Sequence, residues 1–436
     1  MEVRCWTLNQ SRSFTRVFES TASKIAVIGA GIIGVTCAYE LRAHGFDVVL
    51  IDPCNKESAP SSKNAGALAY SEILPIASGA VLRKVPRWLA DSNGPLSIRA
   101  GHLPRILPWL TRFVLASRQK NVRNTAAALA RLNKFSRKLC NPLYDAAQIT
   151  NSIRRIGALH LYESESEFLN ALPGWGLKAD NGIKFRHLTQ ADVLALEPAL
   201  APVLYGATLI EDWHLVSDPG DVLQALFRLA RTTGAEFVRD AVLDIRATDS
   251  GVNIEFANRS NAIRFDQAVI AAGAWSGTLA RRLGDRIPVE AERGYNTTIA
   301  VPNIEINREL IFGEHGFVAT RLDCGLRIGG GAEFAGLDEP PCYERAAAML
   351  RKAGRFLPGL QSGGAHDSQW MGCRPAMPDS RPVIGPSRNN PTVLYAFGHG
   401  HVGLTQAPAT GRLIAELALG RQPGIDIKPY SPDRFH

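Results

Sequence analysis

A glycine-rich turn near the start of the chain constrains the fold more than any other feature of the sequence. The short apolar run at 24–28 leads into Gly29, Ala30, Gly31, Ile32, Ile33 and Gly34, and an apolar helical pattern continues to residue 43. Gly29 allows a tight turn, Gly31 lets backbone N–H groups approach a pyrophosphate, and Gly34 lets the helix pack closely on the strand. The pattern therefore predicts a strand, a turn and a helix that bind a dinucleotide at the helix N-terminus.

An acidic residue stands where a dinucleotide-binding unit requires one. Gly45 ends the predicted helix, residues 47–51 form a second apolar run, and Asp52 follows at its tip, 18 residues after Gly34. The Asp52 carboxylate can accept hydrogen bonds from both ribose hydroxyls of the adenosine half. These features agree on a dinucleotide, but they do not separate FAD from NAD.

Three later segments suit the flavin half of such a cofactor. A loop of small residues contains Ser61, Ser62, Asn64, Ala65, Gly66, Ala67 and Leu68, although a plain surface loop has the same composition. A buried strand ends at Ala272 and Gly273, just before Trp275. A second strand leads through Gly398, His399, Gly400, His401, Val402, Gly403 and Leu404 into a helix. The N-terminus of that helix can stabilise negative charge on a reduced flavin ring.

Composition and charge limit the classes of protein that the chain can belong to. Hydrophobic residues make up 45% and charged residues 21%, which excludes a disordered, coiled-coil or collagen-like chain. The net charge is +8, but no five consecutive residues are basic, so we expect no nucleic-acid partner. The seven cysteines show no CxxC and no paired spacing, so we expect neither a disulfide framework nor a metal site. No apolar run has the length of a membrane span, which favours a cytoplasmic protein and leaves peripheral contact with the inner membrane open.

In their order along the chain, these segments resemble the FAD-dependent D-amino-acid oxidase superfamily. Besides the glycine-rich turn and the loops above, the resemblance rests on Arg374-Pro375-x-x-Pro378-Asp379-x-x-Pro382-Val-Ile-Gly385 and on the final Tyr430 to Phe435. Within the superfamily the chain most resembles bacterial D-amino-acid dehydrogenases, through Asn64 to Gly66, the segment 85–96, and Arg293-Gly294-Tyr295. The resemblance implies FAD as the cofactor. Gly372 stands where some relatives attach flavin through a cysteine, so we expect non-covalent binding.

The resemblance also implies an α/β fold with a discontinuous Rossmann-like FAD-binding domain and an interleaved antiparallel α+β substrate domain. We expect the FAD-binding domain to comprise 24–105, 218–285 and 365–436, and the substrate domain 106–217 and 286–364. Residues 1–23 are expected to form a disordered extension. Asp218 and Pro219 predict the start of a helix, and Val242 opens a strand meander that returns to the cofactor.

The candidate catalytic residues also follow from this resemblance. Arg374 is expected to bind the substrate carboxylate and to border the flavin, and a structural salt bridge is the alternative role. Arg293 and Tyr295 begin a strand expected to line the same pocket, and Tyr70 and His214 lie in loops near it. An aromatic wall is the alternative for the tyrosines, and an ordinary core or surface histidine is the alternative for His214.

These expectations together predict oxidative deamination of a D-amino acid, or of a cyclic D-imino acid such as a D-proline derivative. Hydride transfer from the α-carbon to flavin N5 gives an imine, which water converts to a 2-oxo acid. The electron acceptor, whether a quinone, a carrier protein or O₂, leaves no motif in the sequence. Two alternatives stay open: a glycine/sarcosine-type amine oxidase that uses O₂, and a flavin-holding subunit that docks partner subunits of a larger redox complex.

Overall fold

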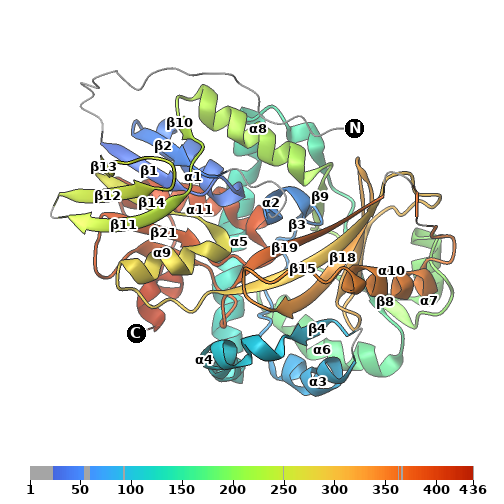
Figure 1. Ribbon diagram of the computed structural model, residues 1–436. Helices are drawn as coiled ribbons and strands as arrows, with labels where there is room; N and C mark the ends of the chain where they lie inside the picture. Colours follow the sequence, from blue (N-terminus) through green and yellow to red (C-terminus); the bar gives the residue numbers. More distant parts are fainter. Residues whose placement is uncertain are drawn as a thin grey trace.

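The computed structural model describes residues 23–53, 59–91, 94–248, 250–361, 363–364 and 367–435 (Figure 1). The expectation of a disordered extension therefore falls outside the described residues, apart from Ser23. Two large sheets dominate the molecule, and the chain passes between them several times (Figure 1).

The first sheet has the order β10-β2-β1-β14-β21-β20, with all neighbours parallel except the last pair. Its strands are β1 (Lys24–Ile28), β2 (Asp47–Ile51), β10 (Glu236–Val238), β14 (Gln267–Ile270), β20 (Val383–Pro386) and β21 (Val393–Phe397). Both faces are covered, which explains why these strands are continuous apolar runs. Ile25 and Val27 pack into a cluster with the helices, whereas Ala26 and Ile28 pack into a second cluster on the other face.

Helices cover one face of this sheet, and a small meander covers the other. The helices are α1 (Ile32–Ala43), α8 (Pro219–Thr232) and α11 (Gly403–Ala418), and the opposite face holds β11 (Val242–Thr248), β12 (Gly251–Phe256), β13 (Ile263–Phe265) and α9 (Ser276–Arg282). The predicted start of α8 is confirmed, because the Asp218 carboxylate accepts a hydrogen bond from the Gly220 N–H at 2.6 Å.

The second sheet has nine strands and is mainly antiparallel, with the order β19-β15-β18-β17-β16-β6-β8-β7 and β4 added beside β18. Its strands are β4 (Leu96–Ile98), β6 (Ala158–Tyr162), β7 (Arg186–Thr189), β8 (Gly206–Ile210), β15 (Glu290–Ile299), β16 (Glu309–Phe312), β17 (Phe317–Leu322), β18 (Gly325–Phe334) and β19 (Ser368–Ala376). The helices α6 (Glu165–Asp180), α7 (Gln190–Leu196) and α10 (Glu344–Phe356) belong to the same part of the molecule. A third, small sheet contains β3 (Ala67–Leu68), β5 (Ile153–Arg154) and β9 (His214–Val216).

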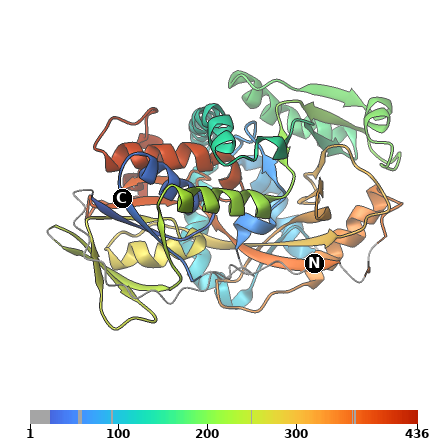
Figure 2. The same cartoon turned by 90° about the horizontal axis from the view of Figure 1, so that it is seen from above.

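The remaining helices connect the two parts. They are α2 (Pro60–Lys63), α3 (Gly79–Ala90), α4 (Leu103–Ala116) and α5 (Gln119–Ala146), with short 3₁₀ turns η1 (Ala100–His102), η2 (Thr150–Ser152), η3 (Gly273–Trp275), η4 (Lys428–Tyr430) and η5 (Pro432–Phe435). Figure 2 shows α5 beside α11, and the Ser136 hydroxyl donates to the Thr405 carbonyl across this contact at 2.5 Å. None of the helices in the described ranges has the length and apolarity to cross a membrane.

The predicted α/β fold class is confirmed, since a parallel sheet is assembled from separate stretches of chain and a second, antiparallel sheet is interleaved with it. Two strands pair with a different sheet from the one that the predicted domain boundaries imply. β4 lies in 24–105 and β19 lies in 365–436, yet both pair within the nine-stranded sheet.

Two of the sequence motifs meet in one buried ion-pair cluster. The Arg434 guanidinium donates to Asp379 Oδ2 at 2.8 Å and to the Arg381 carbonyl at 2.7 Å, and Arg381 also donates to Asp379. Burial acts to raise the pKa of the Asp379 carboxyl, but the charges of Arg434 and Arg381 outweigh it and hold that pKa below its usual range. Asp379, the acidic residue of the Arg374–Gly385 segment, therefore holds the C-terminal segment in place through Arg434.

We expect Arg434→Ala to lower the free energy of unfolding by about 3 kcal/mol, because it removes the main partner of a buried carboxylate. The deficit should be full at neutral pH and should narrow as the pH falls below about 4, since protonation of Asp379 removes the ion pair from wild type as well. Urea unfolding at several pH values measures both effects. Arg388→Ala, which breaks an exposed pair with Asp433, is the control and should cost less than about 1 kcal/mol. Equal losses in the two variants would contradict the assignment.

Candidate functional site

The predicted cofactor segments lie along one edge of the parallel sheet. Gly29 follows β1, Asp52 follows β2, Gly273 follows β14 and Gly398 follows β21. These four strands are neighbours and run in the same direction, so their carboxyl ends meet at the same edge. Ligands of open α/β sheets bind at this kind of edge. Val242 begins β11 shortly after the end of β10, and Trp275 lies half-exposed in η3.

In the turn after β1 the backbone passes so close to neighbouring backbone atoms that only glycine fits, as the sequence predicts. Gly29 has φ +106°, which favours glycine, and a Cβ there would lie 2.4 Å from the Ala271 carbonyl oxygen. A Cβ at Gly34 would lie 1.8 Å from the Gly29 carbonyl oxygen. Asp52 Oδ2 accepts a hydrogen bond from the Ala30 N–H at 2.7 Å, so the acid at the tip of β2 also orders the turn.

The N-terminus of α1 is suited to a pyrophosphate. No acidic residue lies in its first turn, and the Ser61 hydroxyl accepts a hydrogen bond from the Ile32 N–H at 3.0 Å. Ser61 therefore brings the small-residue loop onto the end of the helix that carries partial positive charge. The residues present fit a dinucleotide: a strained glycine turn, helix N–H groups without an acidic cap, and an acid for the ribose.

The small-residue loop is held between the two sheets. Asn296 of β15 donates to the Lys63 carbonyl at 2.8 Å, and Arg327 of β18 donates to the Asn64 carbonyl at 2.5 Å. At the other end, the Thr405 hydroxyl of α11 accepts from the Ala69 N–H at 2.9 Å. Asn64 closes the turn itself, because its Oδ1 accepts from the Gly66 N–H at 2.8 Å. The face of the nine-stranded sheet that carries Asn296 and Arg327 is consequently the face toward the cofactor loop.

Arg374 lies on that same face. In β15 and β19, Glu292 is paired with Arg374, and Asn296 lies four residues from Glu292 and so points to the same side. Arg374 Nη1 donates to Glu292 Oε1 at 2.6 Å and to the Gly331 carbonyl at 2.9 Å. Its guanidinium lies over Gly294, where a Cβ would come within 2.1 Å of Nη2. Arg374 therefore does form a salt bridge, which was the alternative role considered for it. That salt bridge uses only one nitrogen of the guanidinium, Nη1.

The turn after β21 contacts the strand of Arg374 directly. The Gly400 N–H donates to the Pro375 carbonyl at 3.1 Å, which joins the cofactor edge to β19. His399 is buried, its Nε2 lies 2.9 Å from the Thr410 hydroxyl, and burial lowers its pKa to about 3, so it is a neutral structural residue at physiological pH. His401 is exposed at the start of α11.

Gly372 and Cys373 bear on how a flavin is held. Gly372 lies on the face of Arg374, and the ring of Trp370 covers it so closely that a Cβ there would lie 2.1 Å from the indole. Cys373 is buried on the opposite face. Neither position presents a thiol to the cofactor side, which is consistent with the expectation of non-covalent binding.

Arg293 and Tyr295 do not join Arg374, contrary to the expectation of a shared pocket. They alternate with Glu292 and Gly294 along β15 and so point to the other side of the sheet, where both are fully buried. Arg293 donates to the Gly336 carbonyl at 2.9 Å, and the Tyr295 hydroxyl donates to Glu333. Their contacts are structural, and the prediction that they line the pocket of Arg374 is wrong.

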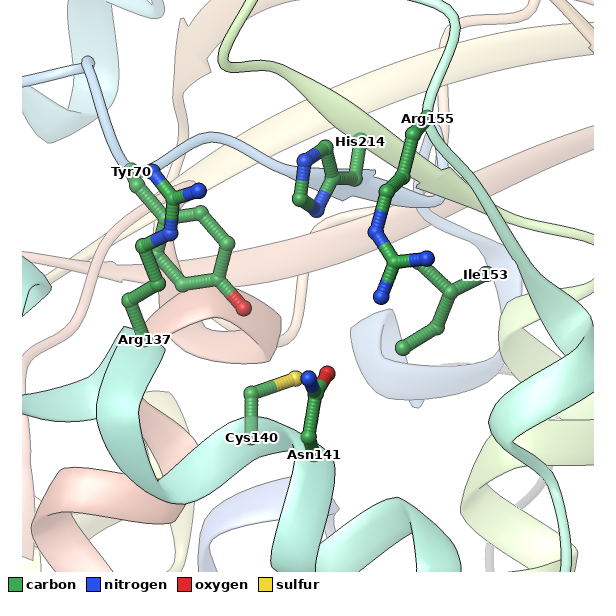
Figure 3. Close-up of a pocket in the computed structure, with 7 residues that line it drawn as sticks. All are labelled: Tyr70, Arg137, Cys140, Asn141, Ile153, Arg155 and His214. Carbon is green, nitrogen blue, oxygen red and sulfur yellow. The ribbon is translucent and has the colours of Figure 1, made fainter.

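Tyr70 and His214 do lie together, in a separate pocket (Figure 3). Their rings meet edge to face with centroids 5.9 Å apart. The pocket is also lined by Arg137, Cys140, Asn141, Ile153 and Arg155, and the two guanidinium groups flank the rings (Figure 3). Burial, followed by the charges of Arg137 and Arg155, lowers the pKa of His214 to about 4. His214 is therefore a neutral imidazole at physiological pH, and Arg374 is not among the residues that line this pocket.

Several residues of the site escaped the sequence analysis. Glu292 and Arg327 are charged residues within strands, and a buried charge in an apolar strand signals a required partner. Arg137 and Arg155 come from α5 and from the segment after β5, which are brought together only by the fold. Their signal in the sequence is weak, because single arginines are common on surfaces.

Comparison with known proteins agrees with this geometry. The family model described as FAD dependent oxidoreductase (DAO) matches residues 24–417. A D-amino-acid oxidase of Bradyrhizobium diazoefficiens is 36% identical, with 94% of this chain and 98% of that protein covered. A D-amino acid dehydrogenase of Paramagnetospirillum magneticum is 32% identical, with 94% and 99% covered. Among solved structures, glycine oxidase from Geobacillus kaustophilus has a TM-score of 0.71 at 22% identity, with 94% of this chain and 98% of that chain covered.

The fold and the site define a flavin-dependent oxidoreductase. The chain belongs to the FAD dependent oxidoreductase (DAO) family, and its cofactor is FAD, as the sequence predicted.

We expect Asp52→Ala to weaken FAD binding by about 1 to 3 kcal/mol, because two ribose hydroxyls lose their acceptor. Titration of apoprotein with FAD, followed by flavin fluorescence, measures the change. Asp47→Ala, at the other end of β2, is the control and should bind FAD as wild type does. Unchanged FAD affinity in Asp52→Ala would contradict the role of this carboxylate.

The low pKa of His214 is measurable by NMR of histidine-labelled protein. We expect a titration midpoint of about 4. Arg155→Gln should raise it, because removing a positive charge favours the imidazolium form. Arg186→Gln, on the exposed strand β7, should leave the midpoint unchanged. A wild-type midpoint near the ordinary histidine value of about 6.5 would show that the pocket is open to water.

Proposed function

We propose that this enzyme catalyses the oxidative deamination of a D-amino acid or a cyclic D-imino acid. The observation that carries the proposal is the position of Arg374, which is fixed on the cofactor side of the nine-stranded sheet and joined through Pro375 to the turn of Gly400. The relatives named D-amino-acid oxidase and D-amino acid dehydrogenase, which match over nearly their whole length, favour the same substrate class.

Arg374 would orient the substrate through its carboxylate. Glu292 and the Gly331 carbonyl hold Nη1, and this leaves Nη2 and Nε, one edge of the planar guanidinium, for a two-point contact with a carboxylate. Gly294 has no side chain, and this leaves space for the Arg374 guanidinium. In the same way, Gly372 leaves space for the Trp370 ring. Such a fixed carboxylate limits the directions in which the α-carbon hydrogen can point.

The cofactor, when bound, supplies the chemistry by accepting the hydride from the α-carbon at N5. The protein's contribution is then orientation and charge. His214, which its surroundings hold neutral, lies with Tyr70 in the pocket that Arg374 does not line, so we give it no part in binding a substrate held by Arg374. Hydrolysis of the resulting imine to the 2-oxo acid needs only water.

The identity of the electron acceptor distinguishes a dehydrogenase from an oxidase. A dehydrogenase passes electrons to a quinone or a carrier protein, whereas an oxidase passes them to O₂. The structural similarity to glycine oxidase is at 22% identity and supports the shared fold, so a glycine/sarcosine-type oxidase is the second candidate for the experiment to separate.

Anaerobic flavin bleaching tests the substrate class directly. We expect rapid loss of the flavin absorbance near 450 nm with at least one D-amino acid or D-proline derivative and slow or no loss with the L-enantiomers, because only one hand places the α-hydrogen correctly once the carboxylate is held. Glycine and sarcosine are achiral and are included to test the second candidate. Admission of O₂ or of a soluble quinone analogue then identifies the acceptor. Bleaching by sarcosine and not by D-amino acids would overturn the proposal.

The role of Arg374 has its own test. Removing one partner of a desolvated charge pair costs about 2 to 5 kcal/mol, so Arg374→Ala should lower kcat/KM for a D-amino acid by roughly thirty-fold to several-thousand-fold. Arg374→Lys should recover part of the loss, since lysine keeps the charge and lacks the planar fork. Glu292→Gln keeps the hydrogen-bond acceptor, so it should mainly alter KM. Wild-type rates in Arg374→Ala with an unchanged flavin spectrum would eliminate this role.

A further inference from the structure

The pocket that contains Tyr70 and His214 is lined mostly by groups that can donate hydrogen bonds (Figure 3). Two of these groups are the guanidinium groups of Arg137 and Arg155, and a third is the side-chain amide of Asn141. Among the described residues that line the pocket there is no Asp or Glu. Such a lining favours a ligand that accepts hydrogen bonds and carries negative charge.

The regular spacing of a helix and of two strands brings these side chains together. Arg137 and Asn141 are four residues apart in α5 and so lie on the same face of that helix. β5 pairs antiparallel with β9, and continuing their register by one residue beyond β5 places Arg155 opposite His214. Ile153 lies two residues before Arg155 and points to the same side of the chain. The helix α5 therefore supplies one wall of the pocket, and the paired strands supply another.

The inner part of the pocket is buried, whereas its arginines reach solvent. Tyr70 and Cys140 are 7% and 2% exposed, and the Tyr70 hydroxyl is hydrogen-bonded to the Cys140 thiol. The side chain of Arg137 is 49% exposed, and Arg155 is also exposed. A ligand can therefore enter from solvent, place its apolar part against the tyrosine ring and keep its charged end beside the guanidinium groups.

The charge of the pocket is only partly balanced. Arg137 forms an ion pair with Asp212. Arg155, in contrast, forms no hydrogen bond or ion pair with any residue in the described part of the chain. After burial, the charges of these two arginines are the next causes of the low pKa of His214, so the electrostatic potential around the imidazole is positive. One negative charge in the pocket would balance the guanidinium that has no partner.

The size of the pocket limits the ligand to a small molecule. The cavity volume is about 70 Å³. Since one water-sized group needs roughly 10 to 15 Å³, this volume holds about five to seven non-hydrogen atoms. A carboxylic acid with a short alkyl or acyl group has this size.

An amino acid suits the pocket less well than a carboxylate that has no amino group. The ammonium group of an amino acid would lie close to two guanidinium groups, and the described lining offers no acid to accept its hydrogen bonds. Inorganic phosphate would match the charge, but it would gain nothing from Ile153 or from the ring of Tyr70. The chemistry of the lining therefore favours a small organic carboxylate.

We propose that this pocket binds a small 2-oxo acid, with Arg155 as the main partner of its carboxylate, at a site separate from that of Arg374. The choice of a 2-oxo acid rests on the proposed function, because that function yields one as its product. Tyr70 follows β3 by two residues, and β3 pairs with the strand of His214. A bound product would therefore contact the end of the small-residue loop that is expected to border the cofactor.

Histidine NMR of the full, FAD-loaded protein provides the test, because His214 reports on this pocket. At neutral pH, we expect pyruvate to shift the ring resonances of His214 in a saturable manner. Saturating pyruvate should also raise the titration midpoint of His214 by at least about 0.5 pH units, because a carboxylate beside an imidazole favours the imidazolium form. Methyl pyruvate, which is uncharged, and L-alanine, which carries an ammonium group, should cause little change. No change with pyruvate, or an equal change with inorganic phosphate, would overturn the proposal.

Two variants separate this pocket from the proposed substrate site. Arg155→Gln keeps a hydrogen-bond donor but loses the charge, so it should weaken the binding of pyruvate seen at His214 by at least about tenfold. Arg374→Ala should leave that binding unchanged, and so should the control Arg186→Gln on the exposed strand β7. The flavin absorbance of each variant shows that it is folded. If Arg374→Ala abolished the effect of pyruvate and Arg155→Gln kept it, pyruvate would bind only at the substrate site and the proposal would be wrong.

This experiment is independent of turnover. Flavin bleaching by D-amino acids tests the proposed function, whereas the resonances of His214 test the pocket in the oxidised enzyme without a substrate. Failure of one proposal can therefore be told apart from failure of the other.

Discussion

The approach of α1 to the end of β1 is the contact on which the site depends. Gly34 lies against the Gly29 carbonyl so closely that no side chain fits between them, and this places the N-terminus of the helix at the edge of the parallel sheet. Ser61 and Asp52 then bond to the N–H groups of this turn and bring a distant loop and the tip of β2 to the same point. A side chain at either glycine would move the helix and with it the anchor for the small-residue loop.

Adjacent residues of β15 lie on opposite faces of the nine-stranded sheet and have different contacts there. Along β15, Glu292 and Gly294 point toward the cofactor loop, whereas Arg293 and Tyr295 point into a buried network with Glu333. The alternation of a strand is the physical reason, because one step along the chain exchanges the two faces. Glu292 holds Arg374 from one side, so the orientation of the residue proposed to bind substrate depends on a carboxylate that is itself mostly buried.

The charges of the candidate site are distributed differently from those of residues 76–123. The candidate site lies where the two sheets meet, and two of its charges have ion-pair partners: Arg374 is paired with Glu292, and Arg137 is paired with Asp212. Residues 76–123 instead contain nine of the 49 Lys and Arg residues and one of the 41 Asp and Glu residues. Paired charges fix a geometry, whereas unbalanced charges attract an oppositely charged surface over the range that salt permits.

The sequence alone determined the family and the cofactor, because a strand, a glycine turn and a helix are local and their spacing is rigid. The segments expected to contact FAD stay a prediction. It also determined the α/β fold class, but its predicted boundaries put β4 and β19 in the FAD-binding domain, whereas both strands pair with the second sheet. Only the tertiary structure decided which face each charged residue takes, that Arg374 meets Glu292, and that Arg137 and Arg155 flank His214. These contacts join residues that are far apart in the chain, and strand register and helix packing, which no local pattern encodes, set which of them meet.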